Sequence, residues 1–393
     1  MDTAQIQERV HEVAAEFARQ RGNRQLRREL LPEDFERLKD AGFLLSGVPV
    51  ELGGIWEDGA RSTRPVCELL RTLAHGDSSV ALVCAMHPAV LSFWLSTPQA
   101  PPPFRDAWAQ QRRQVCEAAR DGAWWGTITS EPGSGGDVAN TRAVARSSAE
   151  DSRGGQGAAG AAYRLSGQKH FGSGAGITSY MLTSAVPAGE SEPDWFYLDV
   201  RGVPWDGSTG MELLAPWDGH GMIATQSHAF RFEAFPASRF AWPGAWRAIQ
   251  GAAAPVVGCC FTAVIVGIAE TAMEAARQQL ERRRSSLRPY EQVEWSQAQL
   301  EGWLIQQAYE GMLRAVESGH DPAAGARSVL LGKTAIATLA ERAMGRLCRV
   351  LGGGTYARTS PVGAWFEDVR ALGFLRPPWG LAYDRLFESS WEA

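Results

Sequence analysis

Two segments in the middle of the chain place hydroxyl, aromatic and glycine residues at a spacing suited to binding a flat ligand. TITSEPGSGGD (residues 127–137) ends an expected strand in hydroxyl side chains and continues into a turn with three glycines. Glycine lets a backbone turn tightly and approach a ligand closely. QKHFGSG (residues 168–174) adds an aromatic ring and a further hydroxyl. The candidate binding residues are Thr127, Thr129, Ser130, Phe171 and Ser173.

Two other side chains could act on a substrate. Arg376, in FLRPPWG, is a cation that could bind a carboxylate or phosphate, or could simply pair with a surface acid in a proline-stiffened loop. His87, in CAMHPAV, could transfer protons near neutral pH, although a histidine inside a helix is more often structural. The six cysteines are scattered, without CxxC or a histidine at zinc spacing, so no metal site is predicted.

Composition excludes several classes of protein. The 393 residues are 45% hydrophobic and 21% charged, which is typical of a globular chain rather than a disordered one. The formal net charge of −5 gives no reason to expect a nucleic-acid or anionic membrane partner. The N-terminus is charged from its second residue, and the most apolar run, Val256–Ala269, is shorter than a membrane span and predicts a buried helix. These features predict a cytoplasmic protein with reduced cysteines.

The periodicity of the sequence changes twice along the chain. Helical spacing runs from Ala4 to about Ala123, short strand-like segments follow, and long helical stretches return from Trp246. We therefore predict a helical domain over 1–122, a β domain over 123–240 and a helical bundle over 241–393. The low-complexity composition of residues 147–162, SSAEDSRGGQGAAGAA, predicts a hairpin loop. The expected strands are Trp124–Ser130, Tyr163–Leu165, Tyr180–Ala185, Trp195–Asp199 and Ala229–Phe232.

The two binding segments resemble the middle-domain signature of the acyl-CoA dehydrogenase superfamily. Flanking segments agree in order over nearly the whole chain, from GVPVELGG (47–54) and LAHGDSSVAL (73–82) to HGMIATQSHAFRFEAFP (220–236) and LGGGTYARTSPVGAWFEDVR (351–370). The resemblance implies an α+β fold with an N-terminal helical domain, a middle antiparallel β-barrel and a C-terminal four-helix bundle. It also implies a flavoprotein, with FAD favoured over FMN, that assembles as a homodimer or homotetramer.

The resemblance gives the candidate residues their expected roles. Thr127, Thr129 and Ser130, with Phe171 as aromatic wall and Ser173 as hydroxyl, would form the flavin face. Arg283, Gly352 and Gly353 would hold the distal end of the cofactor from a neighbouring subunit, the alternative being that Arg283 belongs to a solvated basic face.

The chain departs from the family where the chemistry is decided. A dehydrogenase needs a base within reach of the substrate α-proton, and the family uses a glutamate. The usual position, eight residues after Asp368, holds Arg376, and the known alternative, ten residues before Gly267, holds Val257. Flavin monooxygenases that share this fold also lack that glutamate, and many use a histidine in the pocket. Among the histidines, His87 is the candidate for that position, whereas His220 is expected to be structural.

Three functions follow from this pattern. The first is dehydrogenation or oxidation of a CoA or carrier-protein thioester with a non-standard base and an electron-transfer flavoprotein as partner. The second is a two-component monooxygenase that takes reduced flavin from a reductase and oxidises an aromatic, amine or sulfur compound. The third is a non-redox lyase or scaffold. The first is the preferred function, because the arginines and the Gly-Gly pair at the expected adenine end favour it over the second, although the missing carboxylates weigh against it. The intact hydroxyl groups weigh against the third. Segments rich in tryptophan hint at an aromatic or bulky substrate, although many of these rings are expected to pack in the core. The tryptophans are Trp195, Trp205, Trp217, Trp242, Trp246 and Trp379.

Overall fold

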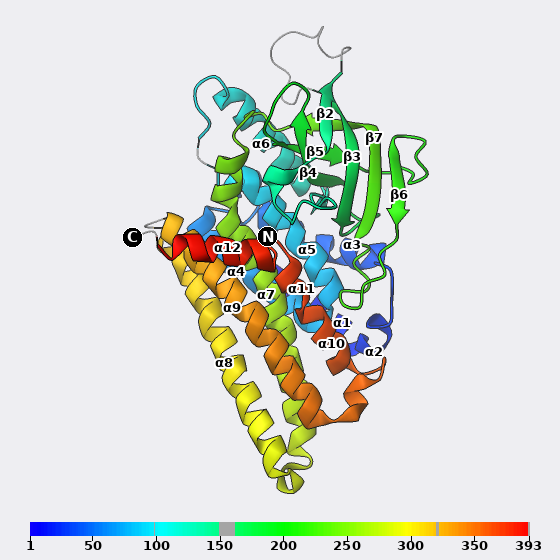
Figure 1. The fold of residues 1–393 in the computed structure, drawn as a ribbon, viewed down its shortest axis with the longest axis vertical. Coiled ribbons are helices and arrows are strands. Elements are labelled where there is room, and N and C mark those ends of the chain that lie inside the picture. The colour runs from blue at the N-terminus through cyan, green and yellow to red at the C-terminus, as the bar shows by residue number, and fades with distance from the viewer. Residues whose placement is uncertain (98, 149–161, 320–321, 392–393) are drawn as a thin grey trace.

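The structure is a computed structural model that describes residues 1–97, 99–148, 162–319 and 322–391. Helices come first, strands follow, and helices return (Figure 1). The strands gather at one end of an elongated molecule, and long C-terminal helices run from them toward the other end. The predicted α+β class is confirmed. The domain boundaries after residues 122 and 240 stay predictions.

The first helices build a platform around one buried element. Helix α5 is covered on all sides, since it packs against α4, α7 and β1. The side chains of Asp58 and Asp77 accept backbone N–H groups at the starts of α4 and α5, as helix N-caps do. The helices are α1 (Thr3–Arg19), α2 (Arg21–Arg24), α3 (Pro32–Asp40), α4 (Gly59–Gly76), α5 (Ser78–Leu95) and α6 (Arg105–Arg120).

The strands close into a small barrel. Strands β4, β2, β3, β7 and β5 pair in that order, and β5 pairs back with β4. The predicted antiparallel pairing is correct for most neighbours, but β1 and β2 both run parallel to β4. Along the chain, β3 follows β2 and runs antiparallel to it, so the chain returns in the direction of β2 when it enters β4. The strands are β1 (Trp125–Thr127), β2 (Val144–Ser147), β3 (Ala162–Gly172), β4 (Tyr180–Pro187), β5 (Asp194–Asp199), β6 (Met211–Ala215) and β7 (His228–Arg239).

Three strand predictions need new boundaries. The ladder of β1 ends at Thr127 rather than Ser130, although the Ser130 carbonyl still accepts the His170 N–H at 2.8 Å. Strand β3 extends far past Leu165, because it pairs with β7 as far as Gly172. Within it Gly167, with φ +151°, passes so close to Ala143 that a side chain would not fit. Strand β7 likewise extends to Arg239. Most of the predicted 147–162 loop lies outside the described residues.

The C-terminal part consists of long helices followed by short ones. Helices α7, α8 and α9 pack along one another, and α10 packs on α7 and α9. Helix α12 crosses the molecule between the barrel and these long helices (Figure 1). The helices are α7 (Trp246–Glu281), α8 (Pro289–Ser318), α9 (Pro322–Leu351), α10 (Pro361–Val369), α11 (Ala371–Phe374) and α12 (Trp379–Ser389).

Two helices, α5 and α7, are long and apolar enough to cross a membrane by composition alone. The apolar stretch of α7 is thus longer than the sequence suggested. However, 89% and 78% of the most apolar windows are buried inside the fold, which is the pattern of core helices. Residues Val256–Ala269 lie in the middle of α7, mostly buried, so the predicted buried helix is confirmed.

Candidate functional site

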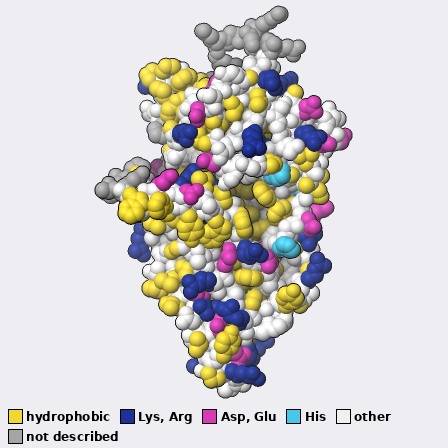
Figure 2. Space-filling model, viewed as in Figure 1, with side chains coloured by type: hydrophobic (Ala, Val, Ile, Leu, Met, Phe, Trp, Pro, Cys, Tyr) yellow, Lys and Arg dark blue, Asp and Glu magenta, His cyan; other side chains and the backbone are white. Residues whose placement is uncertain are grey.

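A cavity of about 1260 Å³ lies where the barrel meets α5, α7, α9 and the α11–α12 loop. One wall comes from α5 and β4 and is apolar, with Met86, Phe93 and Leu182. The surface is hollowed between the strands and the C-terminal helices, and hydrophobic side chains gather around the hollow (Figure 2). A mostly apolar concave site with a few polar groups is the usual form of a cofactor or substrate pocket.

All five residues predicted for the flavin face line this cavity. Thr127, Thr129 and Ser130 reach it from the end of β1, and Phe171 and Ser173 reach it from the end of β3. The structure therefore brings together two segments about 40 residues apart in the sequence, because the Ser130 carbonyl and the His170 N–H join the strand ends.

Phe171 adopts a backbone conformation that bulky residues avoid. Its φ is +60°, and its ring is 55% exposed beside Trp217, with the two ring centres 6.1 Å apart. Such a conformation costs on the order of 1 kcal/mol or more and clusters at functional sites. This backbone conformation directs the ring toward the cavity rather than into the barrel core.

A chain of hydroxyl groups continues from Ser173. Its Oγ lies 2.7 Å from Ser227 Oγ, which in turn lies 2.7 Å from Thr225 Oγ1. All three side chains line the cavity. This chain gives Ser173 a defined orientation and a partner for its proton.

A buried ion pair lies beneath the glycine-rich turn. The Lys169 ammonium donates to Glu131 at 2.5 Å, and the same carboxylate accepts the backbone N–H of Arg142 at 2.7 Å. Burial lowers the pKa of Lys169 to about 8, and the Glu131 carboxylate opposes that change. The pair ties the turn to the barrel. Sequence reasoning gave these two residues no role, although their places within the two family-like segments were a usable signal.

Arg376 lines the cavity from the loop between α11 and α12, which packs against the glycine-rich turn where Pro378 meets Gly136. Burial lowers the pKa of its guanidinium to about 10, although Asp137 and Glu131 oppose that effect. Its Nε and Nη1 atoms are buried without a hydrogen-bond partner in the described part of the chain. The alternative of a surface ion pair is therefore wrong, because no described carboxylate lies within ion-pair distance of this side chain.

Neither position of the family's glutamate supplies a base. Val257 and Arg376, the two positions at which a glutamate was expected, both line the cavity. The lining carboxylates that the structure describes are Glu131, which pairs with Lys169, and Glu367, which pairs with Arg370 at 2.6 Å. An uncommitted carboxylate is thus missing from the described lining.

His87 is held in the protein core and is absent from the cavity lining. Its Nε2 lies 3.0 Å from the Leu44 carbonyl, and its Nδ1 accepts the Trp125 N–H at 3.3 Å. Burial lowers its pKa to about 4, so the ring is neutral near pH 7. This geometry disagrees with a proton-transfer role. His220, expected to be structural, is among the residues that line the cavity.

The residues predicted for the distal end of the cofactor lie away from the cavity. Arg283 donates to Glu291 at 2.8 Å and to the Val350 carbonyl at 2.5 Å. Gly352 and Gly353 follow the end of α9 nearby. Their predicted role requires a neighbouring subunit, so it stays a prediction.

Sequence reasoning missed several polar residues of the cavity. Lys333, on α9, donates to the carbonyls of Leu375 and Pro377 at 2.8 and 2.6 Å. A single lysine within the apolar stretch of α9 was the available signal. Gln250, on α7, leaves its Oε1 buried without a described partner. Of the tryptophans that suggested a bulky substrate, Trp195 and Trp217 line the cavity.

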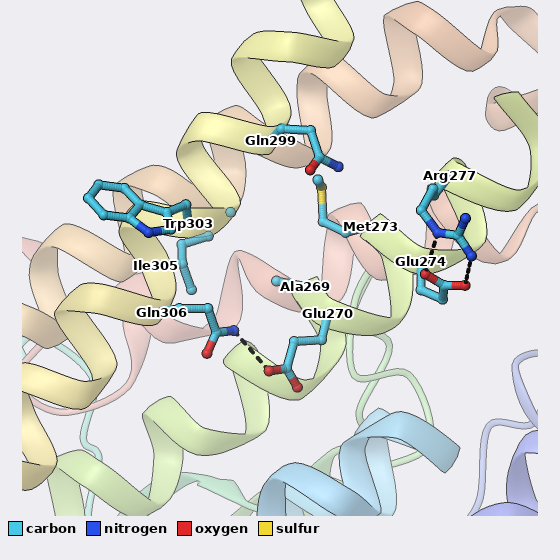
Figure 3. A pocket seen from close by; sticks show the side chains of 10 residues that line it. Ala269, Glu270, Met273, Glu274, Arg277, Gln299, Trp303, Ile305 and Gln306 are labelled. Atoms are coloured by element: carbon cyan, nitrogen blue, oxygen red, sulfur yellow. Dashed lines mark hydrogen bonds and ion pairs between the residues drawn. The ribbon is translucent and has the colours of Figure 1, made fainter. Parts of the chain in front are cut away.

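A second, smaller hollow of about 390 Å³ lies between α7 and α8 (Figure 3). Its polar groups are occupied, since Glu270 accepts a hydrogen bond from Gln306 and Glu274 pairs with Arg277. Trp303 at its edge is 58% exposed. No group of metal-binding side chains occurs among the residues that the structure describes.

The sequence and structure of the chain were compared with those of known proteins. No family model matches the chain. The amino sugar nitrososynthase DnmZ of Streptomyces peucetius is 26% identical over 370 residues, covering 87% of this chain and 82% of the relative. A nitrososynthase from Micromonospora carbonacea var. africana has a similar structure, with a TM-score of 0.80, 20% identity and coverage of 99% and 96%.

A third similar protein is the dibenzothiophene monooxygenase TdsC from Paenibacillus sp. A11-2. Its FMN-bound structure matches with a TM-score of 0.78 at 17% identity, covering 98% of this chain and 97% of TdsC. These likenesses agree with the flavoprotein and fold that the sequence segments implied. The chain is therefore similar over most of its length to an amino sugar nitrososynthase, and it shares its fold with a nitrososynthase and with an FMN-binding monooxygenase.

Proposed function

We propose that the chain is the oxygenase component of a two-component flavin monooxygenase, which oxidises a nitrogen or sulfur atom of a small molecule. A separate reductase would supply the reduced flavin. The observation that carries the proposal is the pairing of a complete flavin face with two base positions, Val257 and Arg376, that hold no carboxylate. Oxygenation of a heteroatom needs no base that removes an α-proton, so this lining suits it.

The cavity residues fit a flavin. The strand end at Thr127, Thr129 and Ser130 supplies hydroxyl and backbone groups, and Phe171 supplies an aromatic wall. Gly136 leaves no room for a side chain, because a Cβ there would lie 2.6 Å from Pro378. When bound, a flavin supplies two-electron redox chemistry and reactivity toward oxygen. FMN and FAD both remain candidates, and the sequence favoured FAD.

The protein's own residues would control access and protons. Met86, Phe93 and Leu182 give the inner wall an apolar surface that excludes water from the reacting atoms. Ser173, connected through Ser227 to Thr225, offers a hydroxyl chain that holds or passes a proton. His87 has no part in this scheme, since both its ring nitrogens are engaged in the core.

The names of the relatives support the choice of substrate atom. DnmZ is named for forming a nitroso group on an amino sugar, and TdsC for oxygenating a sulfur heterocycle. The thioester reading remains the competing hypothesis, with an electron-transfer flavoprotein in place of the reductase. A cytoplasmic location completes the proposal.

We further propose that the chain works as a homo-oligomer, a dimer or a tetramer. Support comes from the outer face of α8, where several large apolar side chains are more than one-third exposed. Water-exposed apolar area of this extent favours a protein partner. These side chains are Tyr290, Val293, Leu300, Trp303 and Leu304.

Equilibrium binding and one rapid-mixing experiment test the proposal. Purified protein is titrated with FMN and FAD, loaded with the tighter one, and mixed anaerobically with octanoyl-CoA. We expect no bleaching of the oxidised-flavin absorbance. Chemically reduced, loaded protein is then mixed with aerated buffer, and we expect reoxidation in two phases where free flavin shows one. Bleaching by the thioester would instead establish dehydrogenation, and failure to bind either flavin would contradict both redox functions.

A further inference from the structure

The cavity contains a buried guanidinium that the protein itself leaves without a partner. Two of its three nitrogens, Arg376 Nε and Nη1, are shielded from solvent and donate no hydrogen bond to any described acceptor. Buried charges are normally paired, because transfer of an unpaired charge from water is costly. The desolvation of Arg376 therefore lowers the stability of the fold, and a bound anion would offset that cost by pairing with the guanidinium.

A second buried cation lies directly beside it. The Lys333 ammonium, 3% exposed as a residue, donates to the carbonyls of Leu375 and Pro377, which flank Arg376 in the chain. Burial lowers the pKa of Lys333 to about 8. Its described contacts include no carboxylate. Lys333 thus fixes the loop that presents Arg376 and adds positive charge to the same wall.

The nearest acids are occupied elsewhere. Glu131 accepts from Lys169 and from the Arg142 N–H, and Asp137 accepts the Ala139 N–H at 3.1 Å. They moderate the charge of Arg376 without forming an ion pair with it. Arg327 and Arg385 also line the cavity, whereas Arg370 is paired with Glu367. The α9–α12 side of the cavity is therefore positive overall.

We propose that Arg376, positioned by Lys333, forms an oxyanion subsite that binds a phosphate or carboxylate group of the substrate. The inference rests on the proposed function for the identity of the substrate pocket, but the subsite itself depends only on this chain's residues. Arginine suits the role because its planar fork of N–H donors matches both anions. The substrate class narrows accordingly to anionic molecules whose oxidised nitrogen or sulfur atom lies some distance from the anionic group.

The test measures anion binding directly by isothermal titration calorimetry at constant ionic strength. Sodium pyrophosphate and sodium succinate are the probes, used with both flavin-loaded and flavin-free protein. The variants are R376Q, R376K and the matched control R113Q, which removes a charge from an exposed arginine on α6. FMN and riboflavin affinities are measured for each variant, and circular dichroism verifies folding.

We expect at least one probe to bind wild-type protein saturably, and R376Q to weaken that binding by 10-fold or more. R376K should retain part of the affinity, and R113Q should stay within 2-fold of wild type. FMN and riboflavin should bind R376Q within 2-fold of wild type. If R376Q does not fold, R376K still tests the idea, because loss of the planar fork should weaken binding several-fold.

Two results would overturn the inference. The first is that neither probe binds wild-type protein, or that R376Q and R376K bind as well as wild type. The second is that R376Q loses FMN but keeps riboflavin, because Arg376 would then hold the phosphate of the cofactor. Failure to load flavin would contradict the proposed function alone, since the titration of flavin-free protein would still report on the subsite.

Discussion

Replacement of His87 by glutamine tests whether this histidine stabilises the fold or takes part in catalysis. In the fold the neutral ring bridges the Leu44 carbonyl and the Trp125 N–H. In His87→Gln the shorter amide can satisfy one of these groups and leaves the other buried. An unsatisfied buried polar group costs about 1–3 kcal/mol. We therefore expect the variant to lose about 2 kcal/mol of unfolding free energy at pH 7.5.

The same contacts predict how this loss depends on pH. Burial lowers the pKa of His87 from 6.5 to about 4, so the unfolded chain takes up the proton first as the pH falls. The wild-type protein therefore loses stability between pH 6.5 and 4. At pH 5 the loss is (6.5 − 5.0) × 1.36, or about 2 kcal/mol. Since glutamine cannot be protonated, the gap between wild type and variant should shrink toward zero at pH 5.

Urea unfolding at pH 7.5 and 5.0, followed by tryptophan fluorescence, measures both values. Other groups titrate alike in the two proteins, so the difference between them isolates His87. A gap that is equal at both pH values would refute the assignment of the ring as buried and neutral. Unchanged stability together with a 100-fold loss of turnover by flavin-loaded protein would restore the catalytic role.

Three further outcomes follow from other contacts. Burial raises the pKa of Asp368 to about 6, so between pH 4 and 6 the folded state keeps this carboxyl protonated while the unfolded chain loses the proton. Wild-type stability should therefore fall as the pH rises from about 4 to 6, and Asp368→Asn should lack that slope in urea unfolding. Arg376→Met should stabilise the flavin-free chain by about 2 kcal/mol, because an unpaired buried charge is removed; lower stability would reveal a partner for Arg376. Trp303→Asp should shift sedimentation toward smaller species, and a wild-type monomer with bound flavin would contradict the shared cofactor site.

The sequence was sufficient to predict the order of the architecture and one wall of the site. Helical and strand periodicities are local, so the change from helices to strands and back was visible directly. The hydroxyl groups of 127–130 and the pair Phe171 and Ser173 belong to two contiguous segments with a family resemblance, and the structure brings them to one cavity. The absence of the glutamate was also readable, because Val257 and Arg376 occupy its two expected places.

What the sequence could not determine depended on contacts between distant elements. The two parallel pairings with β4 and the length of β3 result from tertiary packing, since β3 pairs with β7 from Ala162 to Gly172 and Gly167 passes too close to Ala143 for a side chain. The sequence left His87 as either a pocket residue or a structural helix histidine, and the packing of α5 against Leu44 and Trp125 encloses it.

Arg376 shows the same limit most clearly. From the sequence a surface ion pair was the more common expectation for such an arginine, because the neighbouring residues do not determine which acids reach it. Only the tertiary structure places it beside Lys333, with Glu131 and Asp137 already engaged. Partner choice for a charged side chain is decided by long-range geometry and burial, and these are properties of the folded chain alone.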